Sequence, residues 1–165
     1  MITVSDRSFR KEREDKGGPA VVDAVVRLVE GAAVVETKVV PDERDDIEWN
    51  LKRLADTSAA DLVLTTGGTG LAPRDVTPQA TLAVIDYEAP GLAEAMRAAT
   101  RAAVPTAILS RQVAGVRGKT LIVNLPGSPR GAVECLAVIA PVLPHAAATL
   151  SGERDPHPGP RIQTA

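Results

Sequence analysis

Aromatic residues are scarce in this chain, which has one Trp, one Tyr and one Phe among 165 residues. Proteins that bind single-stranded nucleic acids stack the bases on aromatic side chains, so this sequence cannot build such a platform. The formal net charge of −2 also gives no broad attraction for a phosphate backbone. We therefore expect no nucleic-acid partner.

Cysteine and histidine are equally rare, with one Cys and two His. Cys135 has no partner for a disulfide or a Cys-x-x-Cys motif, and its apolar surroundings predict a small buried side chain. His145 and His157 lack the spacing of metal ligands, and neither lies near a strand-end nucleophile. The sequence therefore argues against a zinc site and against a Ser-His-Asp triad.

Long apolar runs are also missing, since none approaches the ~18 residues of a membrane span, and the first residues do not resemble a signal peptide. We expect a cytoplasmic protein without membrane contact.

The chain is rich in Val, Ala, Leu and Ile, and apolar runs of strand length alternate with longer segments of helical period. This pattern predicts a three-layer α/β/α fold with a mostly parallel, mixed sheet. Strands are expected at residues 1–5, 33–40, 61–66, 106–110 and 120–125. Helices are expected at 19–30, 45–55, from Thr77, at 91–102 and at 130–150, with a kink or break at Pro141 and Pro144.

The connections complete this prediction. Residues 6–18 are expected to form a polar loop, and residues 111–119 a hairpin-like connection that makes one strand antiparallel. Residues 1–150 are predicted to form a single domain, followed by an extended or flexible tail at 151–165 that is rich in Pro and Gly.

A glycine-rich loop, TTGGTG at 65–70, directly follows the third predicted strand. Open α/β sheets bind ligands at the carboxyl ends of their strands, where glycines let the backbone approach an anion closely. The loop matches neither the Gly-x-x-x-x-Gly-Lys phosphate motif nor a dinucleotide fingerprint. On its own it leaves a tight turn and a ligand-binding loop as open alternatives. Its candidate ligand-binding residues are Thr66, Gly67, Gly68, Thr69 and Gly70.

Two acidic residues lie at predicted strand ends or beside the glycine loop. Asp75 precedes Thr77, which is predicted to cap a helix, and Asp42 follows the second strand. Carboxylates at these positions suit a divalent cation held against phosphates. Taken alone, Asp75 is better explained by a surface pair with Arg74 or by auxiliary helix capping, and Asp42 has helix capping as its alternative.

Small polar residues end two further strands. Ser5 and Asp6 follow the first strand, while Pro126, Gly127 and Ser128 follow the last and lead into a helix. Each has an ordinary structural explanation, but the carboxyl ends of parallel strands meet at one edge of a sheet. Their convergence there predicts a ligand-binding crevice.

Six segments in the same order resemble the MogA/MoaB family of molybdenum-cofactor biosynthesis proteins. They are SDR (5–7), DKGGP (15–19), VVPDE (39–43), TTGGTGLAPRDVTPQAT (65–81), PTAILSRQVAGVRG (105–118) and NLPGSP (124–129). The resemblance implies a trimeric molybdopterin-binding fold and a nucleotidyltransferase that uses ATP and Mg²⁺ to adenylylate molybdopterin.

The resemblance also assigns roles by position. Asp42 and Asp75 match the family's two essential acids, tied to Mg²⁺ and to catalysis. Gly67, Gly68, Thr69 and Gly70 would line the phosphate and adenylyl pocket. Ser110, Gly127 and Ser128 would face the pterin.

One segment departs from the family pattern, because the loop after SDR reads SFRKERED and is bulkier and more charged than the usual small-residue loop. Two alternatives remain beside the adenylyltransferase. One is a non-catalytic molybdopterin-binding or scaffold protein of the MoaB type, and the other is a CinA-like nucleotide hydrolase. The resemblance further implies contact with the molybdenum-insertion enzyme.

Overall fold

The computed structural model describes residues 1–57 and 59–152. A six-stranded sheet with the order β2-β1-β3-β6-β5-β4 lies at the centre of the fold. The strands are β1 (Ile2–Val4), β2 (Lys38–Val40), β3 (Leu62–Thr66), β4 (Tyr87–Glu88), β5 (Ala114–Arg117) and β6 (Thr120–Leu125). The helices are α1 (Asp6–Phe9), α2 (Gly17–Leu28), α3 (Arg44–Asp56), α4 (Thr77–Val84), α5 (Pro90–Thr100), α6 (Pro129–Ile139) and α7 (Leu143–Ser151), with the 3₁₀ helices η1 (Pro105–Leu109) and η2 (Ala140–Val142).

The sheet is mixed, as predicted. Strands β2, β1, β3 and β6 pair in parallel, whereas β5 runs antiparallel to both β6 and β4. All six residues of β6 are buried, as expected for a strand covered on both faces.

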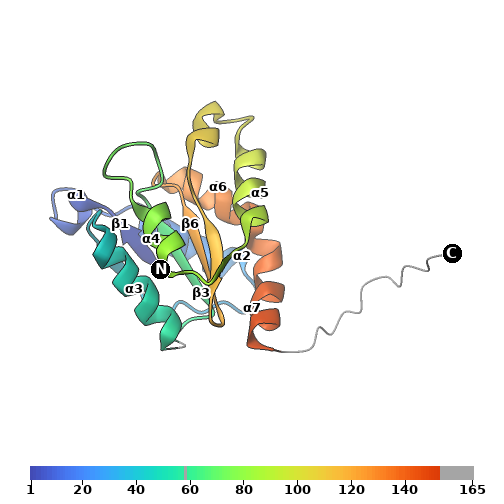
Figure 1. The fold of residues 1–165 in the computed structure, drawn as a ribbon. Coiled ribbons are helices and arrows are strands. Elements are labelled where there is room, and N and C mark those ends of the chain that lie inside the picture. The colour runs from blue at the N-terminus through green and yellow to red at the C-terminus, as the bar shows by residue number, and fades with distance from the viewer. Residues whose placement is uncertain (58, 153–165) are drawn as a thin grey trace.

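Helices cover both faces of the sheet, which confirms the three-layer α/β/α prediction. Figure 1 shows α3 and α4 on one side of the sheet and α5 and α7 on the other. The side chains of β6 divide by the strand's period of two: Ile122 packs with α3 and α4, whereas Val123 packs in the core under α2, α5 and α6. Two aliphatic cores therefore fix the sheet between the helical layers.

The structure corrects four of the sequence-based boundaries. The strand predicted at 106–110 is the 3₁₀ helix η1, and the antiparallel strand is β5, within the segment predicted as a connection. Pro105 starts η1, and Ile108 and Leu109 are both exposed, so this apolar run has no buried face to fix it as a strand. The predicted loop 6–18 contains the short helix α1 and the start of α2, and only residues 38–40 of the predicted strand 33–40 are paired.

The predicted long helix at 130–150 is interrupted as expected, because η2 separates α6 from α7 at Pro141. The run Pro129–Ser151 is nevertheless long and apolar enough to span a membrane, with a mean hydropathy of 1.6, so the expectation that no run reaches this length is wrong. Core helices of globular proteins can have the same length and hydropathy. In α6 the buried side chains that pack in the core are Ala132, Cys135, Leu136 and Ile139. Most of the predicted tail, 153–165, lies outside the described residues, together with His157.

A buried amide links three parts of the fold. Asn124 of β6 is fully buried, and its Nδ2 donates to Thr65 Oγ1 at 3.0 Å and to Thr81 Oγ1 at 2.8 Å. Its Oδ1 accepts from the Val113 N–H at 3.2 Å. The side chain thus connects β3, α4 and the entry to β5, and every polar atom of the amide is hydrogen-bonded.

We predict that Asn124→Leu lowers the free energy of unfolding by about 2–4 kcal/mol, because it leaves the partly buried Val113 N–H and two buried hydroxyls without this partner. Urea unfolding followed by circular dichroism measures the loss. The matched control is Asn50→Leu in α3, since Asn50 is also buried but makes a single hydrogen bond, from Nδ2 to Asp46 O, and its Oδ1 has no partner in the described part of the chain. That variant should cost only about 1 kcal/mol, and equal costs would contradict the role of Asn124.

Candidate functional site

The parallel strands bring their carboxyl ends to one edge of the sheet. Ser5 follows β1, Asp42 lies two residues after β2, Gly67 follows β3 and Gly127 lies two residues after β6. All four line one polar pocket of about 400 Å³. The predicted convergence is therefore present in the structure, and this edge is the candidate functional site.

The glycine loop passes unusually close to its neighbours. Gly67 has φ +104°, and a Cβ at this position would lie 2.2 Å from the carbonyl oxygen of Val4 in β1. Gly68 has φ +62°, and a Cβ there would lie 2.4 Å from Thr77 Oγ1. Both positions require glycine, for conformation and for space.

Thr77 holds this loop and does not cap α4. Its Oγ1 donates to Gly67 O at 2.9 Å, and its N–H donates to Gly68 O at 3.1 Å. The residue that precedes α4 is Val76, so the prediction that Thr77 is the N-cap is wrong. Thr77 instead donates its hydroxyl and its N–H to the carbonyls of the two positive-φ glycines, which lie at the start of the helix.

A second, larger pocket of about 630 Å³ adjoins the polar one. The two pockets share Gly68 and Gly127 in their walls. Asp42 lines the smaller pocket and Asp75 lines the larger one. The two predicted acids thus lie on either side of a glycine wall.

Every residue that was predicted to bind a ligand or to take part in catalysis lines one of these pockets. Those in the smaller pocket are Ser5, Asp6, Asp42, Thr66, Gly67, Gly68 and Gly127. Those in the larger pocket are Gly68, Thr69, Gly70, Asp75, Ser110, Pro126, Gly127 and Ser128. The structure thus gives the positions of these residues, and their roles in binding and catalysis are predictions.

Asp42 and Asp6 are joined through each other's backbone. Asp42 Oδ2 accepts from the Asp6 N–H at 2.6 Å, and Asp6 Oδ1 accepts from the Asp42 N–H at 3.1 Å. Burial raises the pKa of Asp42, and the neighbouring charges of Asp6 and Asp75 act in the same direction. The reciprocal bonds fix the end of β2 against the end of β1, and they leave Asp42 Oδ1 with no bond in the described structure.

Arg74 neutralises Asp6. Its guanidinium contacts both carboxylate oxygens of Asp6, with Nη2 at 2.8 Å from Oδ2 and 3.0 Å from Oδ1, and its Nη1 pairs with Glu43 Oε1 at 2.8 Å. Burial alone would raise the pKa of Asp6, but the Arg74 guanidinium and the Asp42 N–H together hold it below its ordinary value. Arg74 therefore ties the segment after the glycine loop to the ends of β1 and β2.

Asp75 is held by backbone contacts. Its Oδ2 accepts from the Ala72 N–H at 2.8 Å. The Arg111 side chain crosses to this segment, donating from Nε to Gly70 O at 2.7 Å and from Nη2 to Asp75 O. The surface pair of Arg74 with Asp75 that the sequence left open is not formed in the described structure. The partners of Arg74 and Arg111 lie 30 or more residues away along the chain, so the sequence did not indicate them.

Asp42 and Asp75 are candidate ligands for a divalent cation, each in the lining of its own pocket. Asp42 and Asp75 each use one oxygen in the hydrogen bonds described above and keep the other. Within residues 1–57 and 59–152, no three His, Cys, Asp or Glu side chains are grouped closely enough to hold a metal ion alone. Magnesium commonly takes one or two carboxylates and completes its shell with phosphate oxygens and water, so the donor set suits it.

The larger pocket contains two polar residues that the sequence did not indicate, Arg97 and Gln112. Ser110 Oγ lies 3.0 Å from Gln112 Oε1 and 3.4 Å from Thr69 Oγ1, and Arg97 Nη1 donates to Gln112 O at 3.0 Å. Gln112 is buried, and its Nε2 has no hydrogen-bond partner in the described part of the protein. Cys135 lies beside it, and burial raises the pKa of this thiol. Ser110 lines this pocket from the end of η1, and not from the end of a strand as the sequence predicted.

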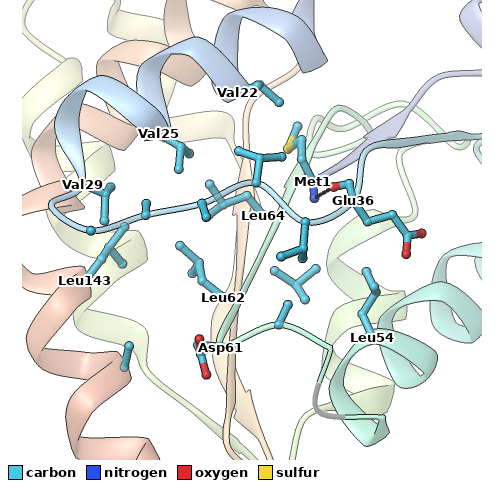
Figure 2. A pocket seen from close by; sticks show the side chains of 18 of the residues that line it. Met1, Val22, Val25, Val29, Glu36, Leu54, Asp61, Leu62, Leu64 and Leu143 are labelled. Atoms are coloured by element: carbon cyan, nitrogen blue, oxygen red, sulfur yellow. Dashed lines mark hydrogen bonds between the residues drawn. The ribbon is translucent and has the colours of Figure 1, made fainter.

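A third pocket, of about 340 Å³, lies at the opposite edge of the sheet. Figure 2 shows Val25, Val29, Leu62 and Leu143 around it, close to the start of β3. Its lining is mainly aliphatic, and none of the predicted site residues contributes to it. We exclude it from the candidate site.

We predict that Arg74→Gln raises the pKa of Asp6, because the burial of this carboxyl is then no longer offset by the guanidinium. Titration of the Asp6 carboxyl carbon by NMR measures the change. Since the paired Asp6 has a lowered pKa, its contribution to stability is present above the ordinary aspartate value of about 3.9 and is lost as the pH falls through the lower, folded value. Arg130→Gln, which breaks an exposed pair with Glu134, is the control and should leave the Asp6 titration unchanged.

Known proteins are similar to this chain over most of its length. Residues 1–145 match the protein family described as a probable molybdopterin binding domain. A molybdopterin adenylyltransferase of Escherichia coli strain K12 is 48% identical over 136 residues, which make up 82% of this chain and 70% of that protein. The crystal structure of the molybdopterin biosynthesis enzyme MoaB from Thermus thermophilus is 50% identical, with a TM-score of 0.84 over 92% of this chain and 94% of the other.

A CinA protein from Thermoplasma acidophilum is also similar, with a TM-score of 0.64 over 86% of this chain and 95% of that one. At 17% identity this similarity concerns the fold alone. The resemblance to the MogA/MoaB proteins, first seen in six short motifs, is confirmed over most of the chain, and this protein belongs to the molybdopterin-binding domain family of molybdenum-cofactor biosynthesis.

Proposed function

We propose that this protein is a molybdopterin adenylyltransferase, which transfers AMP from ATP to the terminal phosphate of molybdopterin. The observation that carries the proposal is the pair of acids, Asp42 and Asp75, on either side of a glycine wall shared by two pockets. An adenylyl transfer brings two phosphate groups together. The glycine wall between two acid-lined pockets would let a phosphate from each pocket approach the other. The similarity to adenylyltransferases supports the same activity.

The reaction is a displacement at the α-phosphorus of ATP. An oxygen of the molybdopterin phosphate forms a bond to this phosphorus, the bond to the β-phosphate bridging oxygen breaks, and the electron pair leaves with pyrophosphate. Such transfers depend on positioning and on neutralising charge more than on a covalent nucleophile. No histidine or cysteine is therefore required.

The residues of this chain supply the positioning. Gly67 and Gly68 bring the backbone close to the substrates because no side chain intervenes. Asp42 and Asp75 would hold Mg²⁺, which when bound neutralises phosphate charge. Arg74 pairs with Asp6, whereas Asp42 keeps one carboxylate oxygen free in the smaller pocket.

The larger pocket suits the pterin. Its lining combines aliphatic side chains with Ser110, Gln112 and Ser128, and a flat polar ring needs both kinds of contact. Ser110 Oγ, held near Gln112 Oε1, would face the pterin as the family resemblance implies.

We predict that Asp75→Asn and Asp42→Asn each lower the rate of adenylylation by a factor on the order of 10²–10³, the typical cost of removing one charge-stabilising group from a transition state. The measurement incubates the purified protein with molybdopterin, ATP and Mg²⁺ and follows the release of pyrophosphate and the formation of the AMP-linked product. Asp23→Asn, at an exposed position of α2 outside both pockets, is the matched control and should keep full activity.

The other two candidate functions give different results in the same assay. A non-catalytic pterin-binding or scaffold protein would bind molybdopterin tightly, would not consume ATP and would be unaffected by Asp75→Asn. A CinA-like hydrolase would cleave a nucleotide such as ADP-ribose in the absence of pterin. The high identity to adenylyltransferases favours neither alternative.

We further propose a cytoplasmic homotrimer that contacts the molybdenum-insertion enzyme. Exposed apolar side chains such as Val35, Leu71 and Ile108 offer surface for contacts between copies or with a partner. Sedimentation velocity at micromolar concentration should give about three times the mass of one chain. A single species with the mass of a monomer would contradict the trimer.

A further inference from the structure

Residues 7–16, the basic segment, cover one side of the smaller pocket. The segment includes the end of α1 and leads into α2. Four of its cations line the pocket, namely Arg7, Arg10, Arg13 and Lys16.

The backbone of the basic segment turns back on itself. Lys11 has φ +60°, a left-handed conformation that is uncommon outside glycine. Beyond this turn, the N–H groups of Glu12 and Arg13 both donate to Arg7 O, at 2.9 and 3.2 Å. The turn therefore brings Arg13 back beside Arg7, and both lie against the same pocket.

Three of the four cations are available to a ligand. Arg10 is paired with Glu12 at 2.9 Å, whereas Arg7, Arg13 and Lys16 form no ion pair within the described residues. All three are exposed.

Two of the four acids that line the pocket are engaged by other groups of the protein. Asp15 Oδ1 accepts from the N–H groups of Gly17 and Gly18, at 2.9 and 3.0 Å, and Asp6 is paired with Arg74. Glu14 and Asp42 remain. A divalent ion on Asp42 would leave the pocket with an excess of positive charge.

The direction of the reaction assigns the pockets. In a phosphoryl-type displacement the attacking and leaving oxygens lie on opposite sides of the phosphorus, roughly in line. The two pockets meet at Gly68 and Gly127, so an α-phosphate at this wall would have the nucleophile on one side and the leaving group on the other. The larger pocket has aliphatic lining for a ring, and the smaller pocket has the free cations.

We propose that the basic segment binds the β- and γ-phosphates of ATP in the smaller pocket, and retains the pyrophosphate after the transfer, through Arg7, Arg13 and Lys16. This inference rests on the proposed function for the identity of the nucleotide. The chemical group that the basic segment would recognise is a chain of two or three phosphates.

The first test measures the binding of inorganic pyrophosphate and of tripolyphosphate to the full chain by calorimetry, with and without Mg²⁺. We expect the double variant Arg13→Gln/Lys16→Gln to bind roughly 10-fold more weakly, because exposed charge pairs each contribute about 2- to 5-fold. The matched control is Arg27→Gln/Arg101→Gln, which removes the same net charge from two exposed positions outside both pockets. Equal weakening in the two double variants, or no binding by the wild type, would overturn the proposal.

The second test separates this subsite from the catalytic activity. In the adenylylation assay the Arg13/Lys16 variant should have a roughly 10-fold higher KM for ATP, an unchanged KM for molybdopterin and weaker inhibition by pyrophosphate. A rise in the KM for molybdopterin alone would place the pterin phosphate on the basic segment and overturn the assignment.

The two proposals fail in different ways. Pyrophosphate binding that depends on Arg13 and Lys16, without any adenylylation, supports the subsite and refutes the enzyme. Adenylylation activity together with pyrophosphate binding that is unchanged in the Arg13/Lys16 variant supports the enzyme and refutes the subsite. An unchanged thermal midpoint of each variant verifies that the substitutions leave the fold intact.

Discussion

At Gly67 the backbone after β3 passes so close to β1 that a single added carbon would lie 2.2 Å from the Val4 carbonyl oxygen. The positions of the other site residues follow from this approach. Thr77 binds the two glycine carbonyls and starts α4, and the segment between them carries Arg74 and Asp75 to the site. Parallel pairing of β2, β1, β3 and β6 then brings Asp42 and Gly127 to the same edge.

The acids at this edge have separate environments. Asp6 is neutralised by Arg74 and exchanges backbone hydrogen bonds with Asp42, so it acts as part of the scaffold. Asp42 is more buried, which raises its pKa. Asp75 lies beyond the glycine wall and is held by the Ala72 N–H. Three carboxylates close together can thus be accommodated, because one is paired with an arginine and the other two face different pockets.

The sequence predicted the layers and the site edge, because periodicity reports burial and strand ends follow from it. It failed at residues 106–110, where β-type residues form the 3₁₀ helix η1, since composition cannot indicate that Ile108 and Leu109 face away from the core. It could not identify Arg74, Arg111 or Gln112, whose roles depend on contacts between distant segments. The sequence predicts Thr77 as a helix cap, because the residues next to it do not indicate that its hydroxyl donates to the carbonyl of Gly67.

The shared wall at Gly68 and Gly127 has a consequence for how this protein can change. Either pocket could acquire a new lining residue through substitutions on its own side, such as in the basic segment or around η1. The wall itself cannot be altered for one ligand alone, because both pockets include it. Variation in substrate preference should therefore accumulate at the two outer rims, while the pair of glycines between them resists replacement in any relative that keeps both ligands.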